Sequence, residues 1–259
     1  MTAGSLVALT LIYFAISMIT VVTGSTTLLT IPVMLQFGIE PRTAVATNML
    51  ALAMLSLGGV LPYLGTSAVD RPRAPLLIWL TLAGSAAGAL LLFAVPAKWM
   101  TLIVPVAMMG VLIVLLAEPP EAAAAGGGVP SPVRARTGYA AMALLSVYGG
   151  FLSGGYATLV TVAGIVFFRY PLLRGIAMSR MLNTASSLIA VAVFAWYRIV
   201  DWRLGVVLSV AGFLGGLLGS HWARKMPATL LRRLFLLTVA ALALKSLIFD
   251  VPWRELTAS

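Results

Sequence analysis

The chain has 259 residues, of which 61% are hydrophobic and 9% are charged, and its formal net charge at pH 7 is +10. A soluble domain is nearer to half apolar and about a quarter charged, and a soluble chain of this size could not hide so much apolar surface. The composition therefore argues against a soluble enzyme, a nucleic-acid-binding protein or a disordered chain. The absence of cysteine excludes disulfides, iron–sulfur clusters and thiol chemistry.

Seven apolar runs are long enough, or nearly so, to cross a bilayer as helices. In chain order they cover about residues 5–22, 43–64, 74–95, 99–117, 175–197, 203–222 and 228–249. The first has no Lys or Arg before it, so we interpret it as a retained helix rather than a cleaved secretory signal. An eighth run, about 138–152, is shorter. The pattern predicts an all-α polytopic membrane protein.

Two further apolar runs, about 25–38 and 155–168, begin at glycine-containing breaks. Each holds roughly 14 residues and would be about 21 Å long as a helix, which is less than a hydrocarbon core of about 30 Å. We expect short broken helices or re-entrant segments at the second position of each half.

A Pro-, Gly- and Ala-rich stretch, 118–137, predicts an aqueous linker between a first membrane repeat, 1–117, and a second, 138–259. Shifting residues 24–97 by 131 positions onto 155–228 gives 16 identities in 74 positions. The identities include Gly24/Gly155, Thr27/Thr158, Ala46/Ala177, Asp70/Asp201 and Gly84/Gly215. These identities predict that the two halves are homologous repeats. The positive-inside rule favours inverted repeats of five segments each with both termini outside, because that topology best separates the basic residues.

The duplicated break is the first candidate site. Its residues are Gly24, Ser25, Thr26 and Thr27 in the first half, and Ser153, Gly154, Gly155 and Thr158 in the second. Glycine lets the backbone leave the helix, which a membrane tolerates only where protein or a watery cavity surrounds it. The N-terminus of the following short helix would then offer free N–H groups to an anion. The alternative is that small residues simply pack two helices closely.

A second polar group lies a few residues inside the third segment of each half. Its members are Thr47 and Asn48, then Ser179, Arg180 and Asn183. Arg180 is about 9 Å deeper than Arg174 if the segment is helical. An ionised residue inside a span is costly and usually functional, and a guanidinium suits oxyanions because it donates two parallel hydrogen bonds. The alternative is an arginine that snorkels to the interface.

Other features have simpler interpretations. Gly84 and Gly88, and the glycines between 212 and 219, predict close helix packing. Lys245 in the last span is a second positive group or a snorkelling side chain. His221 stands at a helix end, where an interfacial position is expected. Ser153 with His221 could form a nucleophile–base pair of an intramembrane serine protease, a remote alternative.

These motifs resemble the TauE/SafE sulfite exporter family. A glycine break, a proline about eight residues later, and a short turn before a span rich in Ala, Thr and Asn run through Gly24 to Pro32, Gly38 to Pro41 and Ala44 to Asn48. A second copy runs through Gly149 to Gly155, Tyr170-Pro171 and Ala177 to Ser179. The sequence departs from the family pattern at Ser25-Thr26-Thr27, where glycines often stand, and at Ala163, which replaces the second proline.

The resemblance implies a secondary transporter, and an exporter, of small sulfur-containing or organic oxyanions such as sulfite, sulfoacetate or related sulfonates. It would work by alternating access around the two breaks, in the inner membrane of a cell. We expect no enzymatic activity, cofactor, metal or nucleic-acid partner. The expected partners are a small anionic substrate, the lipid bilayer and a second copy of the chain in a homodimer. An anion channel or a membrane assembly subunit remains the alternative.

Overall fold

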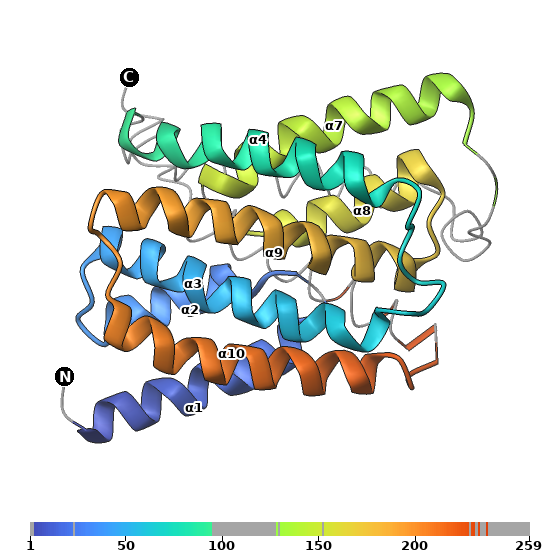
Figure 1. Ribbon diagram of the computed structural model, residues 1–259. Coiled ribbons are helices and arrows are strands. Elements are labelled where there is room, and N and C mark those ends of the chain that lie inside the picture. The colour runs from blue at the N-terminus through green and yellow to red at the C-terminus, as the bar shows by residue number, and fades with distance from the viewer. Residues whose placement is uncertain are drawn as a thin grey trace, which may run out of the picture.

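The computed structural model describes residues 3–22, 24–94, 130–151 and 153–227, with single positions at 128, 229, 230, 233 and 237. Within those residues the chain forms helices joined by short turns, and it has no strand (Figure 1). The helices are α1 (Ala3–Thr20), α2 (Thr26–Gln36), α3 (Pro41–Val60), η1 (Leu61–Tyr63), α4 (Ala74–Ala94), α7 (Pro132–Phe151), α8 (Tyr156–Phe168), α9 (Leu172–Trp196) and α10 (Trp202–Ala223). The predicted all-helical class is confirmed.

Five of the described helices are long and apolar enough to cross a membrane. They are Ala3–Thr20, Arg42–Tyr63, Ala74–Ala94, Leu172–Trp196 and Trp202–Ala223. Each coincides with a predicted apolar run, so the multi-pass character is confirmed. The predicted span at 99–117 lies outside the described residues, as does 228–249 apart from single positions.

Helix α7 begins at Pro132, within the range that we assigned to the linker. Proline fits the first turn of a helix because its missing N–H would have no partner there. Nε of Arg134 in the same turn donates to the carbonyl of Val166 at 2.5 Å, which holds the start of α7 against the end of α8. The remainder of the linker, apart from residues 128, 130 and 131, lies outside the described residues.

Helices α3 and α9 form the centre of the bundle. In an 18-residue window of each span, buried residues make up 72% for Arg42–Tyr63 and 61% for Leu172–Trp196, against 22% for Ala3–Thr20 and 28% for Ala74–Ala94. The outward faces carry large exposed apolar side chains such as Leu11, Leu144 and Val210, as expected of surfaces that meet lipid. The polar groups of the two central helices are therefore enclosed by protein.

Glycines let neighbouring helices approach closely, as predicted. A Cβ atom on Gly88 would overlap the backbone of Val147 in α7, and one on Gly219 would overlap the backbone of Met18 in α1. The predicted packing role of these small residues is confirmed. Helix α4 of the first half thus packs on α7 of the second half, and α10 of the second half packs on α1 of the first.

Helices at matching positions of the two halves run in opposite directions (Figure 1). Arg180 of α9 lies beside Gly59 of α3, and Asn183 of α9 contacts Ser56 of α3, so this central pair is antiparallel. Inverted repeats require such a reversal. The repeat itself stays a prediction, with which this arrangement agrees.

Candidate functional site

Arg180 is the largest fully buried side chain of the described residues. It lies in α9, about 12 Å along the helix from Leu172, and it is 1% exposed. Its Nε, Nη1 and Nη2 atoms are all buried without a hydrogen-bond partner among the described residues. The one ion pair among the described residues joins Arg73 to Asp70 and does not involve Arg180. A buried guanidinium without an acceptor is very unfavourable, so this environment suits a bound anion.

Three other elements surround this guanidinium. A Cβ atom on Gly59 of α3 would lie 3.1 Å from Cδ of Arg180 and 3.4 Å from Oγ of Ser220 in α10. Cγ2 of Val21, just after α1, would lie 2.9 Å from the same Cβ atom on Gly59. The phenol of Tyr63 in η1 lies within electrostatic range of Arg180 and next to Ser220. Both hydroxyls are buried, and neither has a geometrically acceptable hydrogen bond among the described residues.

The face of α9 that carries Arg180 continues with polar groups toward the bundle centre. Nδ2 of Asn183 donates to Oγ of Ser56 at 2.7 Å, while Oδ1 of Asn183 has no partner among the described residues. Oγ of Ser187, one further turn along, is also buried and unsatisfied there. Ser179, in contrast, donates to the carbonyl of Ile176 at 2.9 Å within its own helix. Asn183 therefore fits the predicted role of a neutral hydrogen-bonding ligand better than Ser179 does.

The first break separates α1 from α2 beside this region. Gly24 has φ +82°, a left-handed conformation that favours glycine, and its N–H donates to the carbonyl of Thr20 at 2.8 Å. The hydroxyls of Thr20 and Thr26 are 2.7 Å apart across the break. Ser25 and Thr27 are buried with them.

The second break separates α7 from α8. Gly155 has φ +74°, and Ser153 has φ +55°, an uncommon and strained value for a residue with a side chain. Oγ of Ser153 is buried without a partner among the described residues. The hydroxyl of Tyr148 donates to the carbonyl of Gly154, which fastens the break to α7.

The two breaks touch each other. A Cβ atom on Gly24 would lie 2.5 Å from the backbone nitrogen of Thr158, and one on Gly154 would lie 3.0 Å from Cδ2 of Leu28 in α2. Thr161 of α8 packs against Gly175 of α9, so Thr158, one turn earlier, lies alongside the turn of α9 that leads to Arg180. The first break, the start of α8 and Arg180 therefore lie in one region.

Asn48 bonds to α1 and to the first break with α2 rather than to Arg180. Its Oδ1 accepts hydrogen bonds from Tyr13 at 2.9 Å and from Thr30 at 2.7 Å, and its Nδ2 donates to Thr27 at 3.4 Å. It precedes Gly59 by three turns of α3, which is about 16 Å along the axis. The structure does not bring Asn48 beside Arg180. Neighbouring Thr47 accepts the backbone N–H of Asp201 at 3.0 Å.

The serine and histidine of the protease alternative lie in different surroundings. Ser153 is buried at the second break, whereas His221 is exposed in the last turn of α10. No hydrogen bond between them occurs in the described part of the chain. Lys245 lies outside the described residues.

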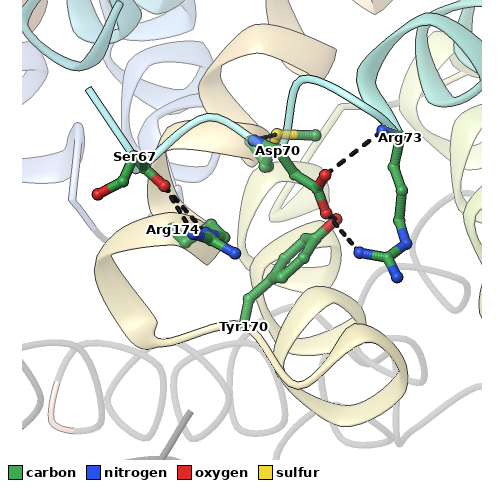
Figure 2. A network of polar contacts seen from close by, with 6 residues as sticks. Ser67, Asp70, Arg73, Tyr170 and Arg174 are labelled. Carbon is green, nitrogen blue, oxygen red and sulfur yellow. Dashed lines mark hydrogen bonds and ion pairs between the residues drawn. The ribbon is translucent and has the colours of Figure 1, made fainter. Parts of the chain in front are cut away.

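A polar network fastens one end of the bundle (Figure 2). Oδ2 of Asp70 accepts from the phenol of Tyr170 at 2.7 Å and from Nη1 of Arg73 at 2.7 Å. Arg174 donates from Nε and Nη2 to the carbonyl of Ser67 at 3.1 and 2.8 Å. A shallow cleft of about 480 Å³ lies between the 65–72 loop and Arg174. The network joins the loop that follows Tyr63 to the corner between α8 and α9.

The network also sets the protonation of its carboxylate. Burial alone would raise the pKa of Asp70, but hydrogen bonds from Tyr170 and Arg73, with the charge of Arg73, outweigh burial and hold that pKa below its ordinary value. Burial and the bond to Asp70 raise the pKa of the Tyr170 phenol. Asp70 is therefore ionised and Tyr170 neutral at physiological pH.

The basic side chains gather at this same end, which we call the basic end. Its members in the described chain are Arg71, Arg73, Arg134, Arg136, Arg169, Arg174, Arg224 and Lys225. Contacts between separate elements confirm that they share one end: Arg224 donates to the carbonyl of Pro62, and Arg174 to that of Ser67. Arg42, Arg198 and Arg203 lie at the opposite end, where α3 and α10 begin.

Sequence reasoning missed Gly59, Tyr63 and Ser220. The signal available was weak, since a tyrosine at the end of a span resembles an interface anchor and a serine after Gly219 resembles a packing residue. Only the packing of α3 against α9 and α10 brings these residues to Arg180.

The fold and this site together define a polytopic helical membrane protein with a buried cation that has no partner in the described part of the chain. A sequence model of the sulfite exporter TauE/SafE family matches residues 9–246, so the chain belongs to that family and is a membrane transporter. The family expected from the motifs is confirmed.

Curated relatives carry the same general name. The chain is 25% identical to probable membrane transporter protein YfcA of Escherichia coli K12 over 239 residues, which cover 91% of this chain and 86% of the relative. It is 26% identical to a probable membrane transporter protein of Haemophilus influenzae over 246 residues, 93% of each chain. It is 25% identical to probable membrane transporter protein ORF9 of a Sinorhizobium species over 226 residues, 87% of this chain and 86% of the relative. No solved structure matches the chain.

Proposed function

We propose that the protein exports small sulfur-containing or organic oxyanions, such as sulfite, sulfoacetate or related sulfonates, and that Arg180 is the charge partner of the substrate. The observation that carries the proposal is the guanidinium of Arg180, which is buried and whose three nitrogens find no acceptor among the described residues. An oxyanion would supply the missing charge and the missing acceptors together. The two helix breaks border the site and would supply its mobile walls, as in transporters with discontinuous helices.

The orientation of the protein supports export. By the positive-inside rule the basic end faces the cytoplasm. Arg180 lies in the half of α9 nearer to that end, because α9 begins there at Leu172. A membrane potential that is negative inside favours exit of an anion by about 2.3 kcal/mol per charge per 100 mV.

The described residues offer no carboxylate relay for protons within a span. Glu40, Asp70 and Asp201, the acids of the described chain, stand at helix ends or in turns. Glu40 accepts the N–H groups of Arg42 and Thr43 as an N-terminal cap, which lowers its pKa. Facilitated export along the anion and voltage gradients is therefore the mechanism that we propose, by alternating access of the Arg180 region to the two sides.

Binding to the purified full-length protein tests the proposal directly. Sulfite, sulfoacetate, taurine, thiosulfate and acetate would be screened for an increase in melting temperature, since a ligand of the folded state must stabilise it. We expect sulfite or a sulfonate to raise the melting temperature of the wild type, Arg180→Lys to weaken the effect, and Arg180→Ala to remove it. Saturable uptake of the same anion into inverted vesicles would then distinguish transport from a channel or an assembly subunit. An Arg180→Ala protein that binds and transports like the wild type would contradict the proposal.

A further inference from the structure

The repeat register reveals an asymmetry around Arg180. Under the shift of 131 positions, Arg180 matches Met49, Tyr63 matches Phe194, and Ser220 matches Ala89. The three matched residues, Met49, Phe194 and Ala89, lie together in one buried apolar cluster of the core.

The shift thus relates two sets of three neighbouring residues, each drawn from both halves of the chain. One set is entirely apolar, and the other combines a guanidinium with two hydroxyls. Apolar side chains pack well at this geometry, so packing does not require the three polar groups. Each polar group adds a cost of burial that a bound ligand would offset.

We propose that Tyr63 and Ser220 are the specificity-determining ligands that complete the Arg180 site for an oxyanion head group with three or more oxygens. The inference rests on the proposed function. The donors come from three elements, η1, α9 and α10, and so approach from different directions. Hydroxyls donate to an anion while adding no charge, which allows the site to release its substrate.

The donor arrangement selects between head groups. A sulfite or sulfonate group spreads three oxygens around its sulfur atom, whereas a carboxylate presents two oxygens in one plane. The fork of Arg180 can hold two oxygens. Tyr63 and Ser220 then hold an oxygen that a carboxylate lacks, so the site prefers sulfite and sulfonates to carboxylates.

The position of Tyr63 connects binding with the basic end. Tyr63 closes η1 and stands directly before the 64–73 loop. Asp70 in this loop is bound by Tyr170, and Asp70 N–H donates to Met178, two residues before Arg180. The docked loop therefore holds Tyr63 close to the turn of α9 that carries Arg180.

The test compares dissociation constants of sulfite, methanesulfonate and acetate for the purified full-length protein. The variants are Tyr63→Phe and Ser220→Ala, whose new residues already occupy the matched positions 194 and 89. The controls are Tyr139→Phe, which removes a half-buried phenol of α7 away from both breaks, and Ser209→Ala, which removes an α10 hydroxyl that is likewise buried without a partner in the described chain. Arg180→Gln reports on the proposed function separately.

We expect each test variant to weaken sulfite and methanesulfonate binding roughly 10- to 100-fold, the effect of losing a hydrogen bond to a charged group. Acetate binding should change less, and the controls should bind all three anions like the wild type. If Arg180→Gln abolishes binding while Tyr63→Phe and Ser220→Ala bind normally, this inference fails and the proposed function stands. If Arg180→Gln binds normally, both fail. Should Ser220→Ala fold poorly, Ser220→Thr must retain binding, because it keeps the hydroxyl.

Discussion

The backbone N–H of Asp70 donates to Sδ of Met178 over 3.3 Å, across the boundary between the two halves of the chain. The matched residue makes the reciprocal contact, since the N–H of Asp201 donates to Oγ1 of Thr47 over 3.0 Å. Thr47 and Met178 are themselves related by the shift of 131 positions. The turn before the fourth helix of each half thus docks on the third helix of the other, which is the exchange expected of inverted halves.

The two turns differ in what holds them. Asp70 binds Tyr170 and Arg73 through its carboxylate, but the matched residues near Asp201 are Ile39 and Leu204, whose side chains cannot bond to it. Asp201 instead caps α10 by accepting the N–H of Leu204. Only the turn at the basic end carries a carboxylate network of this kind in the described chain.

Asp70→Asn should weaken the docked turn and lower the stability of the protein by about 1 to 2 kcal/mol at neutral pH, because Arg73 loses its charged partner in a mostly buried site. The pKa of Asp70 is lowered in the folded state, so its contribution is complete above the unfolded value of about 4 and is lost as the pH falls through the folded value. Melting temperatures of the wild type and the variant should differ from pH 7 to about pH 5 and converge only below about pH 4. Arg71→Gln, on the exposed part of the same loop, is the control. A difference that vanishes near neutral pH would show that the carboxylate charge is not responsible.

Gly24→Ala should abolish transport and strongly destabilise the protein. The residue has φ +82°, and a Cβ atom there would overlap Thr158 at the meeting point of the two breaks. Gly38→Ala separates backbone strain from the contact between the breaks, because Gly38 has φ +79° with open space around it. Backbone strain alone predicts equal effects, of about 1 kcal/mol each. The contact between the breaks predicts a larger loss of melting temperature and of uptake for Gly24→Ala, and equal losses would contradict it.

The topology follows from the basic end. Cysteine introduced at Ser67 or Ser131 should resist membrane-impermeant thiol reagents in intact cells and react after permeabilisation, because both exposed positions lie at the basic end. Cysteine at Arg42, exposed at the opposite end, should react in intact cells. The natural chain has no cysteine, so labelling reports only the introduced residue. Labelling of Ser67 and Ser131 from outside would overturn this orientation.

The helices were predictable from the sequence because the length of an apolar run is a local property. The start of α7 was predicted too late, since Arg134 and Arg136 gave its first turns the composition of a linker. Arg180 was a candidate from the sequence because a charge inside an apolar run is conspicuous, and its substrate role stays a prediction. Its neighbours were predicted less well. Asn48 and Ser179, which the shift of 131 positions matches, lie at opposite levels of the bundle because α3 and α9 are antiparallel. Tyr63 and Ser220 reach Arg180 only through tertiary packing around Gly59, which has no signal in the sequence.

Arg180→Met should increase the stability of the unliganded protein while removing its response to sulfite. The guanidinium of Arg180 is buried in the wild type without a partner in the described chain. Replacing buried ionic groups by apolar residues of similar size has stabilised other proteins by about 1 to 4 kcal/mol. Met also occupies the matched position 49, where it packs in an apolar cluster. Arg174→Met is the control. That side chain donates twice to the carbonyl of Ser67, so its removal should lower the melting temperature. If Arg180→Met also melts below the unliganded wild type, the guanidinium stabilises the fold, and its lack of protein partners would no longer support a substrate role.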